Sequence, residues 1–196
     1  MDLLSEQIEF INELDKLKAV QRKTLVQSAD NRQENSAEHS WHIALVAQVF
    51  AEHAEVGTDM QRVVSMLLIH DIVEIDAGDM FAFAHDDHHQ EQALKEIAAA
   101  NRIFGLLPDS MAETFKSLWF EFEQATSVDA RFAKAMDRVL PVFQNMSNGG
   151  GSWKIHGVAK QQVLKRNAYL QDSAPALWDY VNQQLDLAVS KGWLTE

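Results

Sequence analysis

The adjacent pair His70-Asp71 is the feature of this chain best suited to chemistry. It follows Val63–Ile69, an uncharged and almost wholly apolar run that predicts a helix buried in the core. A buried aspartate is costly unless it is paired or bound to a cation, and a neutral histidine beside it offers a nitrogen ligand. The pair therefore predicts two ligands of one metal ion.

Two further candidate ligands lie on other predicted helices. His39 shares a helical face with Ile43, so it is expected to point toward the core. Asp137 lies beside an apolar stripe that includes Met136. Alone, His39 would fit a hydrogen-bonded core histidine, and Asp137 an ion pair with Arg138. Together with His70-Asp71, on three separate helices, they favour a metal site.

The donor set contains nitrogen and oxygen but no sulfur, because the chain has no cysteine. Such a set suits an octahedral ion such as Mn²⁺, Fe²⁺, Co²⁺ or Mg²⁺, with Zn²⁺ as a further candidate. An ion with an open position polarises a phosphoryl oxygen and activates a water for attack on phosphorus. One divalent cation is therefore the expected cofactor.

Two more carboxylates follow the metal pair. Glu74 lies four residues after His70 on the same helical face, and Asp79 follows at the turn after Ala77-Gly78. They could orient the attacking water and protonate the leaving oxygen, two roles that need different pKa values. The alternative is that Glu74 is a surface acid and Asp79 a turn residue.

These motifs resemble a known family. The spacing of His39, His70-Asp71 and Asp137 is similar to the H…HD…D pattern of HD-domain metal-dependent phosphohydrolases. Residues Arg32–Ser40 resemble the R-x-E-x-x-(A/S)-(E/D)-H-S segment of its 5′-deoxynucleotidase branch, and His70–Asp79 resemble its HD-x-x-E-x-x-x-GD segment. The resemblance is strong over about residues 30–140. It implies an α-helical, commonly dimeric enzyme that hydrolyses nucleotide phosphomonoesters.

The resemblance also implies roles by position. It gives metal ligands at His39, His70, Asp71 and Asp137, acid/base groups at Glu74 and Asp79, and substrate contacts at Arg22 and Arg32. A structural role competes closely with substrate binding at Arg32. The branch also has a tryptophan near Arg22, linked to sugar discrimination, where this chain has Lys23-Thr24-Leu25. The phosphatase chemistry is therefore predicted, but selectivity for deoxyribose is not.

Helical periodicity extends over nearly the whole chain and predicts an all-α fold, a single HD-domain helical bundle. Helices are expected over about residues 3–18, 36–56, 58–75, 90–104, 108–125, 127–147, 158–170 and 174–191. Residues 20–35 are predicted to be a loop, and no sheet is expected. We predict one domain over residues 1–196, with a metal-binding core at about 30–140 and a C-terminal helical extension at 150–196.

Composition restricts the function further. The chain has 196 residues, 46% of them hydrophobic and 23% charged, as is typical of a globular protein. Its net charge of −12 argues against a nucleic-acid polymer as partner. There is no apolar stretch long enough to cross a membrane, and the first residues lack a signal peptide. The expected location is cytoplasmic.

The leading hypothesis is a phosphohydrolase for a small phosphate monoester, most simply a (deoxy)nucleoside 5′-monophosphate. One alternative is an HD hydrolase for another phosphorylated metabolite, such as a guanosine polyphosphate. Another is a non-catalytic HD module that senses a nucleotide, although a pure binder does not need Glu74 and Asp79. The expected partner is a small phosphorylated substrate, and the resemblance adds a homodimer.

Three other signals carry less weight than the metal motif. His85–His89 is expected to be a solvated loop near the pocket rim, because no scaffold orients its side chains. Glu121–Glu123 is expected to be a solvated helix end. Trp153 and His156 follow a glycine run that would let them fold over the pocket as a lid.

Overall fold

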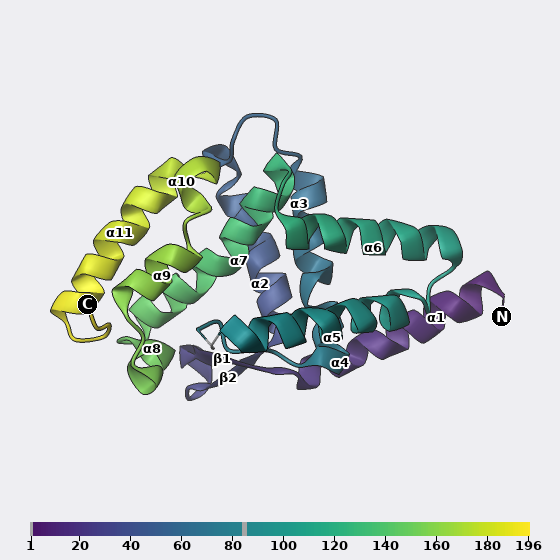
Figure 1. Ribbon diagram of the computed structural model, residues 1–196, viewed down its shortest axis with the longest axis horizontal. Helices are drawn as coiled ribbons and strands as arrows, with labels where there is room; N and C mark the ends of the chain where they lie inside the picture. The colour runs from purple at the N-terminus through teal and green to yellow at the C-terminus, as the bar shows by residue number, and fades with distance from the viewer. Residues whose placement is uncertain (1, 84–85) are drawn as a thin grey trace.

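Helices contain most of the described residues, which confirms the all-α prediction (Figure 1). The structure is a computed structural model that describes residues 2–83 and 86–196, without the side chains of residues 86–89. The elements are α1 (Leu3–Leu14), β1 (Gln21–Val26), β2 (Arg32–Asn35), α2 (Ser36–Val49), α3 (Met60–Ile69), α4 (Glu74–Ala77), α5 (Asp86–Phe104), α6 (Asp109–Gln124), α7 (Val128–Ser147), α8 (Gly151–His156), α9 (Lys160–Arg166), α10 (Leu170–Ser173) and α11 (Pro175–Ser190). Among these described helices, none combines the length and the apolar character that a membrane span requires.

Three helices from distant parts of the sequence, α2, α3 and α7, pack against one another at the centre of the molecule (Figure 1). Their apolar faces meet through fully buried side chains such as Ile43, Met66 and Phe132. Burial of each such side chain contributes about 1.5–3 kcal/mol. Because His39 lies on α2 and Asp137 on α7, this packing brings two of the predicted ligands together.

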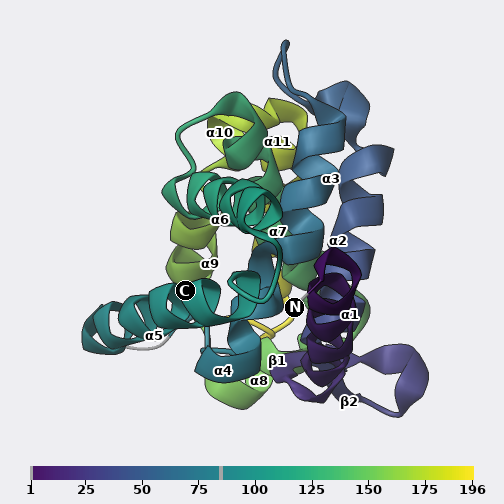
Figure 2. The same ribbon diagram turned by 90° about the vertical axis from the view of Figure 1, so that its right-hand side faces the viewer.

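Two groups of helices flank this centre. On one side, α1, α5 and α6 share a second apolar cluster that includes Phe10, Ile103 and Trp119. Figure 2 shows the molecule from the end formed by α1 and α6. On the other side, α8 to α11 add Trp153 and Leu185 to the central core (left in Figure 1).

The segment 20–35, predicted as a loop, instead contains the antiparallel hairpin β1–β2. The expectation of no sheet was therefore wrong. The strands are short and largely polar, so they lack the alternation that identifies strands in a sequence. At the turn, Asp30 and Asn31 both adopt left-handed backbone angles, which these residue types tolerate. The hairpin carries Arg22 on β1 and Glu34 on β2.

The N-terminal caps of α2 and α3 lie one residue from the predicted positions. The α2 cap is Asn35 rather than Ser36, and it forms a capping box with Glu38. The α3 cap is Asp59 rather than Thr58, and its carboxylate accepts hydrogen bonds from two N–H groups of the first turn. Asn and Asp are at least as favourable as Ser and Thr at this position, which accounts for both differences.

The helix predicted over residues 58–75 changes from α-helical to 3₁₀ geometry near its C-terminal end, where His70 and Asp71 lie. After α3, His70–Val73 form a 3₁₀ turn, and α4 then ends at Gly78, whose φ is +74°. A 3₁₀ helix has three residues per turn. Asp71 and Glu74 therefore lie on one side of this segment.

The C-terminal half follows the predictions with two differences: α8 begins within the glycine run, where no helix was expected, and one predicted helix is divided. Ser127 caps α7 as predicted, and α7 continues through Pro141. Because proline has no N–H, the carbonyl of Asp137 loses its usual helical partner there. The helix predicted over residues 158–170 is divided into α9 and α10, since residues 167–169 leave the α-helical conformation.

The segment His85–His89 was predicted to be a loop, and the structure describes the backbone of residues 86–89. His85 lies outside the described residues. Residues 86–89 form the first turn of α5, so for them the loop prediction was wrong.

Candidate metal centre and adjoining cavities

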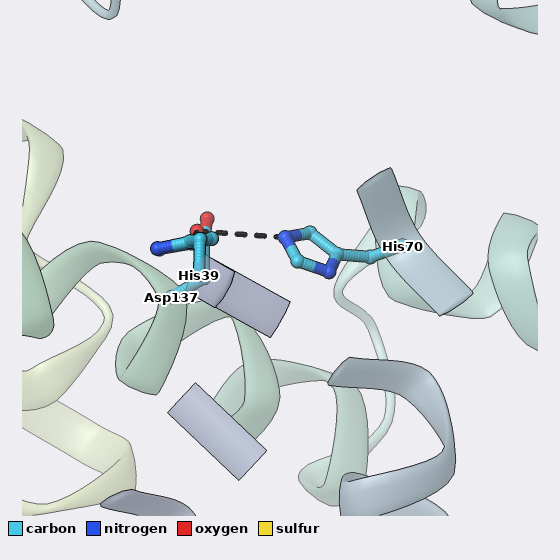
Figure 3. Close-up of side chains that lie close together, drawn as sticks. All are labelled: His39, His70 and Asp137. Carbon is cyan, nitrogen blue, oxygen red and sulfur yellow. Dashed lines mark hydrogen bonds and ion pairs between the residues drawn. The ribbon is translucent and has the colours of Figure 1, made fainter. Parts of the chain in front are cut away.

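His39, His70 and Asp137 converge on one point (Figure 3), and their ligand atoms all lie within 4.8 Å of one another. They come from α2, from the 3₁₀ turn after α3, and from α7. All three side chains belong to buried residues, and His39 is fully buried. The structure thus brings together three of the four predicted metal ligands.

Both imidazoles face an oxygen atom on their outer side. The Nδ1 atom of His70 lies 2.9 Å from the carbonyl oxygen of Leu67, in position to donate a hydrogen bond. The Nδ1 atom of His39 lies 3.3 Å from the Glu34 carboxylate. Their Nε2 atoms face Asp137, at 3.0 Å for His39 and 3.7 Å for His70. Contacts of this kind at Nδ1 are typical of histidines whose Nε2 binds a metal.

The buried donor atoms fit a divalent cation. His70 Nε2 is buried and makes no hydrogen bond, although Oδ1 of Asp71 is only 2.8 Å away. Burial lowers the pKa of His70, but the carboxylates of Asp71 and Asp137 raise it to about 10. The site therefore attracts positive charge strongly and has a nitrogen without a hydrogen bond at its centre. Two imidazoles with carboxylates match the donor set of an octahedral first-row ion.

Asp71 lies beside this cluster. Its Oδ2 accepts a hydrogen bond from Nη1 of Arg22 at 2.7 Å, while its Oδ1 is the atom near His70. Burial raises the pKa of Asp71, but His70 and Arg22 lower it to about 2. The group within 4.8 Å contains only the other three residues. As a fourth ligand, Asp71 stays a prediction.

Glu74 and Asp79 flank Arg22, and the pKa of each is raised. Ser36 donates a hydrogen bond of 2.6 Å from Oγ to Oε2 of Glu74, and burial with the nearby Asp71 raises the pKa of Glu74 well above its ordinary value. Burial raises the pKa of Asp79 to about 6, against the opposing effect of Arg22, whose Nη1 lies 3.8 Å from Oδ1 of Asp79. Buried carboxylates with raised pKa values are typical of acid/base sites.

Two cavities adjoin this cluster. The first, named the metal-side cavity, includes in its wall His70, Asp71, Glu74, Glu96, Phe122, Glu123, Lys134 and Asp137. The second, named the aromatic cavity, includes in its wall Lys23, Phe81, Phe83, Asn145, Trp153 and Asn167. Arg22, Asp79, Arg138 and Arg166 line both cavities. A ligand could therefore place one end in each.

Comparison with known proteins identifies the family of this chain. The family model described as "HD domain" matches residues 14–178. The chain belongs to the HD domain family. The crystal structure of a predicted metal-dependent phosphohydrolase from Magnetospirillum magnetotacticum MS-1 is 43% identical, with a TM-score of 0.91 and 99% of each chain covered. The predicted membership of the HD-domain phosphohydrolase superfamily is thereby confirmed.

Curated relatives of this HD domain are more distant. The human 5′-deoxynucleotidase HDDC2 is 28% identical over 137 residues, which are 70% of this chain. That match spans 65% of the length of the human protein. The 5′-deoxynucleotidase YfbR of Salmonella arizonae is 26% identical over 171 residues, with 81% of this chain and 83% of the relative covered.

Glu34 is a residue of the HD site to which the sequence analysis assigned no role. It is 2% exposed, and its Oε1 accepts a hydrogen bond of 2.7 Å from Gln144. Burial raises the pKa of Glu34, but His39 and Gln144 lower it more. Glu34 therefore stays ionised behind His39, with Oε2 at 3.3 Å from Nδ1 of the imidazole. Its place five residues before His39, within the quoted motif, was the available signal.

The segment Glu121–Glu123, predicted to be a solvated helix end, lies in the last turn of α6, and two of its residues line the metal-side cavity. Phe122 is buried, and its ring packs against His70 with a centroid distance of 4.9 Å. Glu123 pairs with Lys134 at 2.9 Å, and both line the metal-side cavity. The solvated interpretation therefore holds for Glu123, which is exposed, but not for Phe122, because α6 packs against α7 along this edge.

Arg32 lines neither cavity. Its guanidinium makes two hydrogen bonds to the Glu38 carboxylate, at 2.9 and 2.7 Å, at the start of α2. The geometry therefore supports the structural role rather than a substrate contact. Trp153 is 3% exposed and forms part of the wall of the aromatic cavity, while the His156 ring packs on Phe81 at 4.7 Å.

Proposed function

We propose that this protein hydrolyses the phosphomonoester of a nucleoside 5′-monophosphate, with one divalent cation held by His39, His70, Asp71 and Asp137. A cation there would polarise a phosphoryl oxygen and make a bound water nucleophilic. The names of the curated relatives support the substrate class, and the two adjoining cavities support a substrate with a phosphate at one end and a ring system at the other.

Glu74 and Asp79 divide the proton transfers. Glu74 lines only the metal-side cavity, where it is fixed by Ser36 and takes the proton of the attacking water. Its raised pKa makes it a stronger base than an ordinary carboxylate. Asp79 lines both cavities, so it can reach the bond between phosphate and nucleoside. With a pKa of about 6 it donates a proton to the leaving oxygen.

Arg22 orders the charged groups around the phosphate. Its Nη1 donates to Asp71 and lies 3.8 Å from Asp79, and the surrounding carboxylates raise its pKa although burial alone would lower it. This permanently charged group is held at the junction of the cavities, where it contacts the phosphate. The nucleoside then packs against Phe81 and Trp153 in the aromatic cavity.

One observation carries the proposal: the His39, His70 and Asp137 cluster and two carboxylates with raised pKa values meet around Arg22. The test strips the protein with a chelator and reloads it with Mn²⁺, Co²⁺, Fe²⁺, Mg²⁺ or Zn²⁺. Each form is assayed on ribo- and deoxynucleoside 5′-monophosphates, 3′-monophosphates, guanosine polyphosphates and glycerol phosphate.

The expected result is metal-dependent phosphate release that is fastest with 5′-monophosphates. Preferential hydrolysis of guanosine polyphosphates would overturn the substrate and favour the rival HD hydrolase. A metal-loaded protein that binds nucleotides but releases no phosphate would favour the sensing module. A homodimer and a cytoplasmic location stay predictions, which light scattering and cell fractionation would test.

A further inference from the structure

The aromatic cavity contains more positive charge than one phosphate requires. Its charged lining residues are Arg22, Lys23, Arg138, Arg166 and a single carboxylate, Asp79. The whole chain has a net charge of −12, so this local excess of cations is opposite to the overall charge. A cavity with such a lining concentrates anions.

The three arginines at the junction differ in how their charges are neutralised. Arg22 donates to Asp71 and lies within 4 Å of Glu34 and Asp79. Among the side chains that the structure describes, neither Arg138 nor Arg166 has a carboxylate within that distance. Charges held partly away from water are costly unless they are paired, so these two half-buried cations in one wall indicate an anionic ligand.

The guanidinium of Arg138 is held in place without an ion pair. It stacks on the Tyr169 ring at 4.5 Å, and its Nη1 donates to the carbonyl oxygen of Arg166 at 3.0 Å. Its Nε is buried and has no hydrogen-bond partner. The side chain is therefore preorganised, and an unused donor remains for a ligand.

The helix geometry separates Arg138 from the metal cluster. Successive residues of an α-helix point about 100° apart, so the side chain of Arg138 leaves α7 in a different direction from that of Asp137. Arg138, Val142 and Asn145 follow the i, i+4, i+7 spacing of one α7 face, and all three line the aromatic cavity. Arg166 reaches the same cavity from α9. Both arginines also line the metal-side cavity, so they lie at the junction, next to the place where the nucleoside was positioned above.

We propose that Arg138 and Arg166 form a second phosphate-binding site for a phosphate group on the leaving part of the substrate. This inference rests on the proposed function and sharpens it. The preferred substrate is a nucleoside bisphosphate, whose 5′-phosphate is cleaved beside the metal ligands while the other phosphate is held by the two arginines. Each charge-assisted contact of this kind changes binding by about 10- to 100-fold.

The test compares AMP with adenosine 3′,5′-bisphosphate as substrates of the metal-loaded wild type, Arg138→Gln, Arg166→Gln and Arg166→Lys. Arg131→Gln is the matched control, because Arg131 lies on α7 but pairs with Glu55 and lines neither cavity. We expect the wild type to prefer the bisphosphate in kcat/KM by at least about tenfold. Both glutamine variants should lose this preference through KM, and Arg166→Lys should recover part of it.

Two outcomes would overturn the second site. Equal kcat/KM for the two substrates in the wild type would show that no second phosphate is recognised. Equal losses on both substrates in the glutamine variants would assign the arginines to the cleaved phosphate or to folding.

A measurement of product binding tests the second phosphate site independently of the proposed function. Calorimetry with adenosine 3′-monophosphate, the expected product, should show binding to the wild type that weakens about 10- to 100-fold in Arg166→Gln. If this loss occurs but neither nucleotide is hydrolysed, the proposed function fails and the anion site stands. If hydrolysis occurs and Arg166→Gln binds the product as the wild type does, the anion site fails alone.

Discussion

The two cavities share a wall but differ in charge and in origin. Acidic side chains predominate in the metal-side cavity, where Asp71, Glu74, Glu96, Glu123 and Asp137 all contribute. The aromatic cavity has one carboxylate among several cations and aromatic rings. An acidic wall suits a metal ion and proton transfer, whereas cations and rings suit an anionic, ring-containing ligand. The comparison teaches that chemistry and recognition differ in the residues that line only one cavity, such as Glu74 and Glu123 against Phe81 and Trp153, while Arg22, Asp79, Arg138 and Arg166 are common to both.

The largest effect is expected from the metal ligands. Asp137→Ala removes the carboxylate that faces both imidazoles, so metal content should fall below about a tenth of the wild-type value and activity should fall with it. Metal analysis and kinetics on one preparation measure both, with the exposed Asp179→Asn as control. Full metal content in Asp137→Ala would show that the metal ion is not bound at this cavity.

The residue between the cavities should show a leaving-group effect. Asp79→Asn should reduce hydrolysis of a nucleoside monophosphate by about 10²–10⁴-fold. It should reduce hydrolysis of p-nitrophenyl phosphate far less, because that leaving group needs no proton. Since Asp79 donates only when protonated, wild-type kcat/KM should fall as the pH rises above about 6, and the variant should lose this dependence. Equal losses on both substrates would contradict the acid role.

A smaller effect should follow from loss of the group behind His39. Glu34→Gln keeps the shape of the side chain but removes the charge that orients the imidazole, so metal affinity should fall about 10- to 100-fold. Competition with a chelator measures this affinity, and circular dichroism checks that the fold is kept. Unchanged affinity would show that Glu34 serves packing alone.

The aromatic cavity should affect recognition with little effect on chemistry. Phe81→Leu removes a ring that packs on Phe83 and His156, so KM for a nucleoside monophosphate should rise about threefold to tenfold. The kcat value, and kcat/KM for glycerol phosphate, should change by less than about threefold, because neither depends on the ring. A loss of kcat with unchanged KM would contradict the division between the cavities.

The sequence was informative about the metal-side cavity for a physical reason. A histidine or an aspartate on an otherwise apolar helix has few stable environments other than a shared site, so His39, His70 and Asp137 could be singled out. The helices that hold them also have clear apolar periodicity. Their convergence follows from the packing of α2, α3 and α7, which buries those periodic faces.

The aromatic cavity could not be predicted in the same way. Arg138 lies on α7 and Arg166 on α9, where a charged residue normally faces solvent, and only the tertiary fold brings both side chains to the junction of the cavities. The hairpin was not predicted because its strands are polar. Since Glu34 lies on the hairpin, its position behind His39 was not predicted either. When tertiary packing brings a residue of an ordinary surface type into a cavity, the local sequence pattern gives no indication of it.

The central claim is that a divalent cation binds among His39, His70 and Asp137, with Asp71 as the fourth ligand. The most direct test is anomalous diffraction from crystals of the protein loaded with Mn²⁺. We predict one anomalous peak at roughly 2.0–2.4 Å from Nε2 of each histidine and from a carboxylate oxygen of each aspartate. An active Mn²⁺ enzyme whose anomalous peak lies away from these side chains would contradict the account.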